Sequence, residues 1–360
     1  MRYRAIEVAL ALAMMMATGA AAQTPQSTPI ELRDGRDFRH DHTRMGVPAA
    51  LVGLPRRSGA QLVADQLDIS FQYESDDRSE MATVYLYRVA IGDLPLWFDR
   101  AIGVVTLNPT LGKATAIGSP ASFALPGQSM ASALAQGFDV DGSKEYRGSA
   151  LAMAAHGEWL VKLRYSSKRH DAATAVERAE AMIGALKWPR KIDGIAAVAP
   201  IAPCATRLAF EPDAKPVVES EEARMQRAIL GGVLGSLVAN KKLRAKAKRL
   251  DWCRHGTDNP MIALYSTEGA ADSYLIALSD SGIGLRIDGG ADGLRALIDK
   301  ERKVQPNWQA SLWLADRVIN FQSFDGLPPV DTALATLKTK PVGTASTWGD
   351  KPSISIAPSE

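Results

Sequence analysis

The amino-acid sequence predicts an α+β protein with two domains, each a mainly antiparallel sheet packed with helices. Segments with an apolar residue at every second position recur along the chain, which is the pattern of half-buried strands. Toward the end of each half, such a segment is followed by a stretch with apolar residues at helical spacing that stops before a proline. The chain of 360 residues is also long enough for two domains of ordinary size.

The first 22 residues have the layout of a secretory signal peptide. Arg2 and Arg4 give a basic start, Val8–Ala17 is an uninterrupted apolar run, and Ala20–Ala22 supplies the small residues that a signal peptidase requires. The apolar run is about half of the ~20 residues that a spanning helix needs, which argues against a permanent membrane anchor. We therefore expect cleavage after Ala22 and a mature protein that is periplasmic or secreted.

The first domain is expected to span 47–190. Residues 23–46 precede it, and because they carry two prolines and no periodic pattern, they are expected to form a flexible lead-in. Alternation of apolar and polar residues over 69–73 predicts a strand, and the β-branched and aromatic residues of 83–89 predict an interior one. Apolar residues at helical spacing predict a helix over 94–107.

The strongest strand pattern of the first domain covers 159–165, where four apolar or aromatic residues share one face and two cations point to the other. Between 171 and 187 the period changes to that of a helix, and Pro189 stops it. In its order of strands closed by a covering helix, this half resembles the PsbP/Mog1-like fold. The resemblance implies a small sheet-and-helix domain and no particular function.

Small residues and two prolines over 191–203 predict a linker to the second domain, which is expected over 204–340. A long helical pattern covers 221–250, and a loose tail is expected over 341–360. Further strands are expected over 261–265, 274–278, 283–287 and 312–322, with a short closing helix over 332–337.

Cys204 and Cys253 are the two cysteines of the chain. Because a signal peptide directs the protein to an oxidising compartment, we expect them to form a structural disulfide in the second domain. The alternative is a pair of buried, unpaired thiols. A redox role is disfavoured because the Cys-x-x-Cys spacing is absent.

The sequence lacks the linear motifs of common enzymes. It contains no Gly-x-Ser-x-Gly, Ser-x-x-Lys or His-Glu-x-x-His pattern, no phosphate-binding loop and no dinucleotide fingerprint, so no cofactor is predicted. The formal net charge of +2 gives no electrostatic reason to expect a nucleic-acid partner. These observations favour a non-catalytic accessory or binding module of the bacterial envelope over an enzyme.

A hydrolase with its site in the cleft between the domains is the alternative, because catalytic triads assemble from distant segments. His156 and His170 flank the strand over 159–165, near ends where a site could form, and are the candidate bases.

His40 and His42, with Asp41 between them, are the nearest approach to a metal-binding pattern. The segment adjoins the lead-in and is flanked by arginines, which repel a cation. A solvated polar turn is therefore favoured over a metal site.

The most unusual internal segment is an uncharged run over 229–239 that is followed at once by a basic stretch over 241–249. The basic stretch would suit an anionic lipid surface, where each cation contributes ~1 kcal/mol, and the apolar run would suit a partner helix. A buried helix start with a solvated basic face explains the same pattern and is favoured. The cations concerned are Lys241, Lys242, Arg244, Lys246, Lys248 and Arg249.

Overall fold

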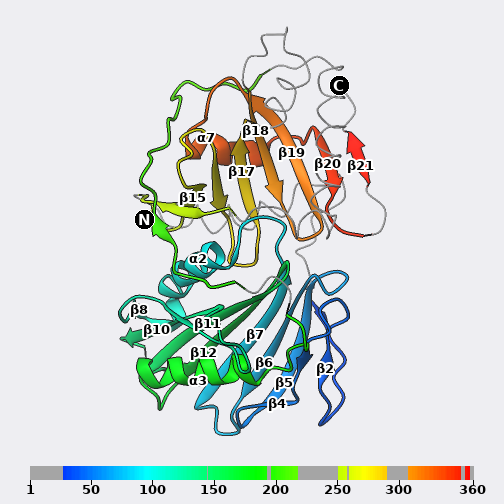
Figure 1. The fold of residues 1–360 in the computed structure, drawn as a ribbon, viewed down its shortest axis with the longest axis vertical. Coiled ribbons are helices and arrows are strands. Elements are labelled where there is room, and N and C mark those ends of the chain that lie inside the picture. The colour runs from blue at the N-terminus through cyan, green and yellow to red at the C-terminus, as the bar shows by residue number, and fades with distance from the viewer. Residues whose placement is uncertain are drawn as a thin grey trace. The chain divides into compact units, whose positions relative to one another are not determined.

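The computed structural model describes residues 27–143, 145–192, 196–217, 250–257, 259–289, 307–349 and 353–356. The described chain divides into two compact units. The N-terminal unit comprises Ser27–Ile201 with Ser279–Ser281, and the C-terminal unit comprises Ala202–Leu278 and the residues from Gly282 onward. Sheet predominates over helix: one large antiparallel sheet forms the N-terminal unit, and a second sheet forms the C-terminal unit (Figure 1). The signal-peptide prediction lies outside the described residues.

Within the described residues, ten strands form the sheet of the N-terminal unit, in the order β1-β5-β6-β7-β12-β11-β10-β8, with β4 beside β5 and β9 beside β10. Strands β7 and β12 are neighbours in the sheet although residues 89–158 separate them in the sequence. The strands predicted over 69–73, 83–89 and 159–165 are present as β6, β7 and β12. The strands are β1 (Thr28–Pro29), β4 (Ala50–Leu51), β5 (Leu54–Val63), β6 (Asp68–Glu74), β7 (Glu80–Arg88), β8 (Lys113–Ala116), β9 (Ala121–Phe123), β10 (Ala133–Asp141), β11 (Gly148–His156) and β12 (Trp159–Ser167).

Helix α3 (Ala172–Ala185) packs closely against β10, β11 and β12 because small residues make room for it (Figure 1). A Cβ added at Gly148 would lie 2.4 Å from the carbonyl carbon of Asp171, and one added at Gly137 would lie 2.9 Å from the carbonyl oxygen of Ala172. Only glycine permits approaches this close. The paired positions on this face of β10 and β11 are Ala133, Ala135, Gly137, Gly148, Ala150, Ala152 and Ala154.

Helix α2 (Leu94–Thr106) occupies the segment predicted as a helix over 94–107. It begins at Asp93, whose carboxylate accepts a hydrogen bond from the backbone N–H of Leu96 at 3.4 Å, as an N-cap residue does. The helix packs against β8, β10 and β11 and buries its apolar side, including the indole of Trp97. A short 3₁₀ turn, η1 (Pro109–Leu111), follows it.

The expectation of a flexible lead-in over 23–46 is wrong in two places: Thr28–Pro29 pairs with β5 as β1, and the last part is packed. Strand β2 (Phe38–Arg39) pairs with β3 (Gly46–Val47), and His40 and Met45 between them are buried. The ring of Phe38 lies 4.9 Å from that of Phe71 on β6. The sequence pattern was misleading because a hairpin of two-residue strands is too short to show a period.

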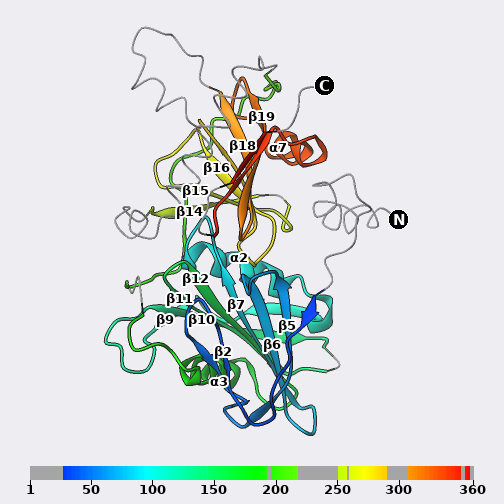
Figure 2. The same ribbon diagram turned by 90° about the vertical axis from the view of Figure 1, so that its right-hand side faces the viewer.

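The part of the C-terminal unit that the structure describes forms a sheet of nine strands in sequential order, β13 to β21. The first pair, β13 and β14, is parallel, and the others are antiparallel. Helix α7 (Val330–Ala335) and the 3₁₀ turn η2 (Thr336–Lys338) pack on a core that includes Leu285 and Ile287 (Figure 1 and Figure 2). The strands are β13 (Ala202–Pro203), β14 (Trp252–His255), β15 (Ala263–Thr267), β16 (Tyr274–Ala277), β17 (Gly284–Asp288), β18 (Trp308–Trp313), β19 (Arg317–Phe324), β20 (Gly343–Ser346) and β21 (Ile354–Ile356).

Two further expectations about this unit are corrected. The single strand expected over 312–322 is a hairpin, because a turn with the Leu314 N–H donating to the Arg317 carbonyl at 2.9 Å separates β18 from β19. Apolar alternation continues on both sides of this turn and hides it. The tail expected over 341–360 contributes β20 and β21 to the sheet. Likewise Ala202–Pro203, expected to end the linker, forms β13.

The predicted disulfide between Cys204 and Cys253 is confirmed. Cys204 directly follows β13, and Cys253 lies on the neighbouring strand β14, so the bond secures the parallel strand pair at the start of the sheet. Within the described ranges, none of the helices has the length and apolar character needed to cross a membrane.

Candidate functional site

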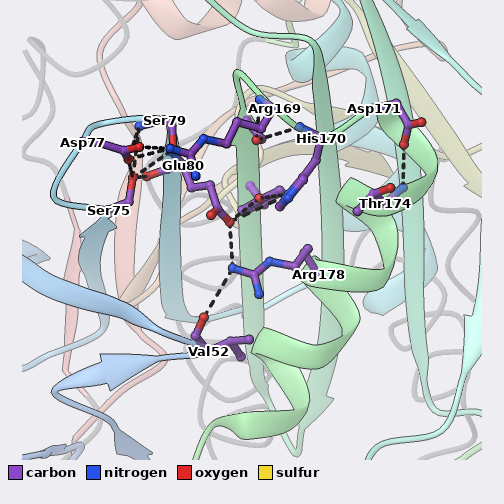
Figure 3. A network of polar contacts seen from close by, with 12 residues as sticks. Val52, Ser75, Asp77, Ser79, Glu80, Arg169, His170, Asp171, Thr174 and Arg178 are labelled. Atoms are coloured by element: carbon purple, nitrogen blue, oxygen red, sulfur yellow. Dashed lines mark hydrogen bonds and ion pairs between the residues drawn. The ribbon is translucent and has the colours of Figure 1, made fainter.

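Four polar side chains meet at one end of the sheet face that α3 covers, and we call them the Glu80 network (Figure 3). Glu80 begins β7, Tyr165 lies near the end of β12, His170 precedes α3, and Arg178 lies within α3. The strand register explains the first contact. Glu80 pairs with Ser167, two residues beyond Tyr165, so both side chains project from the same face.

The carboxylate of Glu80 is the centre of the network. Its Oε2 atom accepts hydrogen bonds from the Tyr165 hydroxyl at 2.6 Å and from Nη2 of Arg178 at 2.7 Å. The same nitrogen of Arg178 donates to the backbone carbonyl of Val52 at 3.3 Å, which ties the turn between β4 and β5 to the network. Strands β7 and β12 and helix α3 are thus joined through one carboxylate, and Arg178 adds the turn between β4 and β5.

His170 extends the network by one bond. Its Nδ1 atom lies 2.8 Å from the Tyr165 hydroxyl oxygen and 3.8 Å from Oε2 of Glu80. Because the single hydroxyl proton of Tyr165 is donated to Glu80, the hydroxyl oxygen accepts from His170, which places a proton on Nδ1. The Nε2 atom makes no hydrogen bond with the described residues, and the side chain is 28% exposed.

The network fixes the charges of Glu80 and Tyr165 at neutral pH. Burial opposes the charge of Glu80, but the hydrogen bonds from Tyr165 and Arg178 outweigh it and lower the pKa of Glu80. Burial and the bond to Glu80 raise the pKa of Tyr165 to about 12. Glu80 is therefore an anion and Tyr165 a neutral donor over the whole physiological range.

A neighbouring carboxylate, Asp77, is held in a similar way beside the network (Figure 3). Its Oδ1 atom accepts from the hydroxyls of Ser75 and Ser79, each at 2.7 Å, and its Oδ2 atom forms an ion pair with Arg169. The hydrogen bond from Ser75 is the largest of several that lower the pKa of Asp77. Both serine protons are thus directed at a carboxylate that stays ionised.

Local backbone contacts position His170 between β12 and α3. The hydroxyl oxygen of Ser167 accepts from the backbone N–H groups of Arg169 and His170, both at 3.0 Å, which turns the chain sharply after the strand. Asp171 then caps α3 by accepting from the Thr174 N–H at 3.0 Å. This turn therefore places the imidazole ring of His170 beside Tyr165.

The structure separates the two histidines that the sequence offered as bases. His156 ends β11 and pairs with Trp159 at the start of β12, whereas His170 follows the other end of β12. Those ends are about 26 Å apart at the usual rise per strand residue. The two histidines do not share a site, and only His170 joins the Glu80 network.

The turn expected at His40 and His42 is present and Asp41 is exposed, but the expectation that it is solvated is wrong for His40, which is buried. Its Nδ1 atom lies 2.8 Å from the Thr43 hydroxyl and its Nε2 atom 3.0 Å from the Gln66 carbonyl, so both nitrogens are engaged. Burial lowers the pKa of His40 to about 4. His42 directs its Nε2 atom to the Asp65 carbonyl at 2.8 Å. These contacts compete with any metal ion for the imidazole nitrogens.

A second polar cluster occupies the face of the same sheet opposite α3. Lys162 is buried there, with its Nζ atom 4.5 Å from the centre of the Tyr85 ring and 2.7 Å from Oδ2 of Asp280, which belongs to the same unit. Asp68 is buried nearby, and its Oδ1 atom has no hydrogen-bond partner among the described residues. Burial raises the pKa of Asp68 to about 7 although Lys162 opposes the shift.

Sequence reasoning did not single out Glu80, Tyr165 or Arg178 as site residues. Tyr165 reads as one of several apolar residues on the buried face of a strand, while Glu80 and Arg178 read as solvated charges. Only the register between β7 and β12 brings Glu80 and Tyr165 together, and the packing of α3 on the sheet adds Arg178. The basic residues over 241–249 lie outside the part of the chain that the structure describes.

Comparison with solved structures gives a weak similarity to a protein from Bacteroides thetaiotaomicron VPI-5482, whose crystal structure is known at 1.50 Å resolution. The two chains are 10% identical, the similarity covers 75% of this chain and 100% of that chain, and the TM-score is 0.20. Such a TM-score supports neither a fold assignment nor a function. No known protein family and no curated protein matches the sequence. The resemblance to the PsbP/Mog1-like fold stays a prediction.

Proposed function

We propose that the chain is an exported, non-catalytic binding module of the bacterial periplasm or cell exterior, released by cleavage after Ala22. The disulfide between Cys204 and Cys253 supports an oxidising compartment, because such bonds persist outside the cytoplasm. In this proposal the Glu80 network stabilises the scaffold that carries the binding surface. The expected ligand is an envelope protein or an anionic lipid surface.

The observation that carries the proposal is that the polar side chains around His170 are hydrogen-bonded to one another: Glu80 accepts from Tyr165 and Arg178, and Asp77 accepts from Ser75 and Ser79. The directions of the pKa shifts agree with this. An acid or base that works at neutral pH needs a pKa near 7. The pKa of Glu80 and that of Asp77 are lowered, while the pKa of Tyr165 is raised to about 12, so all three move away from neutrality. This is the pattern of hydrogen bonds that hold a structure together.

The serine hydroxyls near the network support the same conclusion. A serine nucleophile must donate its proton to a base such as a histidine. Ser75 and Ser79 donate theirs to Asp77 instead. The side chain of Ser167 is fully buried and accepts hydrogen bonds from the turn before α3.

A hydrolase that uses His170 is a second candidate, and one specific observation favours it. The Nδ1 atom is oriented by Tyr165 and the Nε2 atom makes no hydrogen bond with the described residues, which is how a general base is held. The further candidate, a membrane-surface protein using 241–249, stays a prediction from sequence.

The two candidates are separated by testing the purified mature protein against chromogenic carboxylic esters, phosphate esters and peptides. We expect no turnover that differs between the wild type and His170→Ala, while His170→Ala lowers the melting temperature. Turnover by the wild type that is lost in a folded His170→Ala variant would establish the hydrolase and refute the binding module.

Two further measurements test the export of the protein and its binding role. The protein recovered by osmotic shock should have an intact mass that begins at Gln23, and recovery from the cytoplasm with Met1 attached would contradict export. Crosslinking in cells should give a saturable complex that added mature protein competes away. Absence of any competed complex would contradict a binding role.

A further inference from the structure

Four side chains with sulfur, nitrogen or oxygen ligand atoms meet beside the disulfide of the C-terminal unit. Cys253 and His255 are two residues apart on β14, so both project from one face of the strand. Ser266 on β15 is the direct partner of Cys253 in the strand register and therefore shares that face. Cys204 joins them from the end of β13, where its N–H donates to the Arg254 carbonyl at 2.9 Å.

The hydroxyl of Ser266 marks the centre of this group. Its oxygen lies 2.9 Å from Nε2 of His255, 3.5 Å from Sγ of Cys204 and 3.6 Å from Sγ of Cys253. The two sulfur atoms and the imidazole nitrogen all lie within 4.8 Å of one another. Ser266 and Cys253 are each 1% exposed, so the inner side of the group is shielded from water.

The geometry points to a redox-gated metal site: when the disulfide is reduced, Cys204, Cys253 and His255 bind one Zn²⁺ ion. Two thiolates and an imidazole are a ligand set that suits zinc, with a water molecule or the Ser266 hydroxyl completing a tetrahedron. In that tetrahedron the sulfur atoms stand about 3.8 Å apart, given Zn–S bonds of ~2.3 Å. Side-chain rotation about the cysteine Cα–Cβ bonds supplies this separation.

The chemistry of gating requires a dithiol reductant. A thiolate of the reductant attacks Sγ of Cys204, which is more exposed than Cys253, and the S–S bond breaks with its electron pair leaving on Cys253. The second thiol of the reductant then displaces Cys204, so the reductant becomes a disulfide and the protein gains two thiols. Zn²⁺ binding releases the two thiol protons.

His255 is suited to the ligand role by its position. Its Nε2 atom lies 2.9 Å from the Ser266 hydroxyl oxygen and within 4.8 Å of both sulfur atoms. In the oxidised protein the disulfide sulfurs are no longer thiolates and the metal loses two of its three protein ligands. Exchange with an oxidised dithiol, which is reduced to two thiols as the bond between Cys204 and Cys253 re-forms, therefore expels the ion, and bound Zn²⁺ in turn slows this exchange.

The test uses the full mature chain, reduced with dithiothreitol and desalted under argon, with Co²⁺ as the spectroscopic probe and Zn²⁺ as its competitor. We expect one equivalent of Co²⁺ to give the absorption of a tetrahedral site and a thiolate-to-cobalt charge-transfer band. The oxidised protein should give neither. His255→Ala should weaken binding at least ~10-fold, and the matched variant His42→Ala, in the other unit, should not.

Three outcomes would overturn the inference. The first is a reduced wild type that binds no Co²⁺, and the second is equal binding by His255→Ala, which would mean that the thiols alone capture the ion. The third concerns folding: circular dichroism could show that the reduced chain is unfolded and that Zn²⁺ does not refold it. A second readout supports the site independently, because stoichiometric Zn²⁺ should slow re-formation of the disulfide in the wild type and less so in His255→Ala.

Discussion

Replacing Glu80 by Gln removes the charge at the centre of the Glu80 network while keeping the size of the side chain. The carboxylate accepts hydrogen bonds from Tyr165 at 2.6 Å and from Arg178 at 2.7 Å. Hydrogen bonds to a charged group contribute about 1.5–3 kcal/mol each. The Arg178 side chain is 26% exposed, so solvent weakens its share. We expect Glu80→Gln to lower the free energy of unfolding by ~2–3 kcal/mol.

Urea denaturation followed by tryptophan fluorescence measures this change, and Glu177→Gln is the matched control. Glu177 precedes Arg178 on α3 and is exposed, so its replacement should change the free energy of unfolding by no more than ~0.5 kcal/mol. An effect of Glu80→Gln as small as that of the control would refute a stabilising network.

The pH dependence of the same difference tests the electrostatic origin. The pKa of Glu80 is lower in the folded protein than its ordinary value of 4.5. Its stabilising contribution is therefore complete above the unfolded-state pKa and is lost as the pH falls through the folded-state pKa. The gap between the wild type and Glu80→Gln should narrow in acid. A gap that stays constant would assign the effect to side-chain packing.

Four other predictions concern stability. Gly148→Ala should destabilise the N-terminal unit by ~1–3 kcal/mol, because the added Cβ would lie 2.4 Å from the Asp171 carbonyl carbon. Gly103→Ala within α2 should instead stabilise the N-terminal unit by ~0.5–1 kcal/mol, because the nearest atom is the flexible end of an arginine. Equal shifts in melting temperature for Gly148→Ala and Gly103→Ala would contradict both predictions. The folded-state pKa of Asp68 is raised to about 7, so its protonated form stabilises the fold at low pH and that contribution is lost as the pH rises from about 4 to 7. Above neutral pH, urea denaturation should give Asp68→Asn a free energy of unfolding higher than that of the wild type by on the order of 2 kcal/mol. This difference should vanish in acid. The double variant Cys204→Ser/Cys253→Ser opens a loop with a sequence separation of 49 and should lower the free energy of unfolding by ~2–4 kcal/mol, measured by thermal or urea unfolding. An unchanged transition would show that the disulfide does not stabilise the fold.

The strands and helices of the first half were predictable where their patterns are long. The predicted helix over 171–187 is α3, because its capping aspartate and its stripe of small apolar residues are local features. The pairing of Cys204 with Cys253 was predictable because the chain has no other cysteines. The hairpin over 38–47 and the strands after residue 341 were not predictable, because two- to four-residue strands carry no period. Strand β20 pairs with the longer β19, whereas β2 and β3 pair with each other.

The sequence by itself determined which long segments of the N-terminal unit become sheet and helix, because apolar alternation and helix capping depend on residues that are close in the sequence. Tertiary structure decided which distant residues meet. Glu80 and Tyr165 are 85 positions apart, and their contact depends on a strand pairing set by the whole sheet. Long-range register depends on summed burial along entire strands, so the partners of a single charged side chain cannot be read from its own neighbours in the sequence.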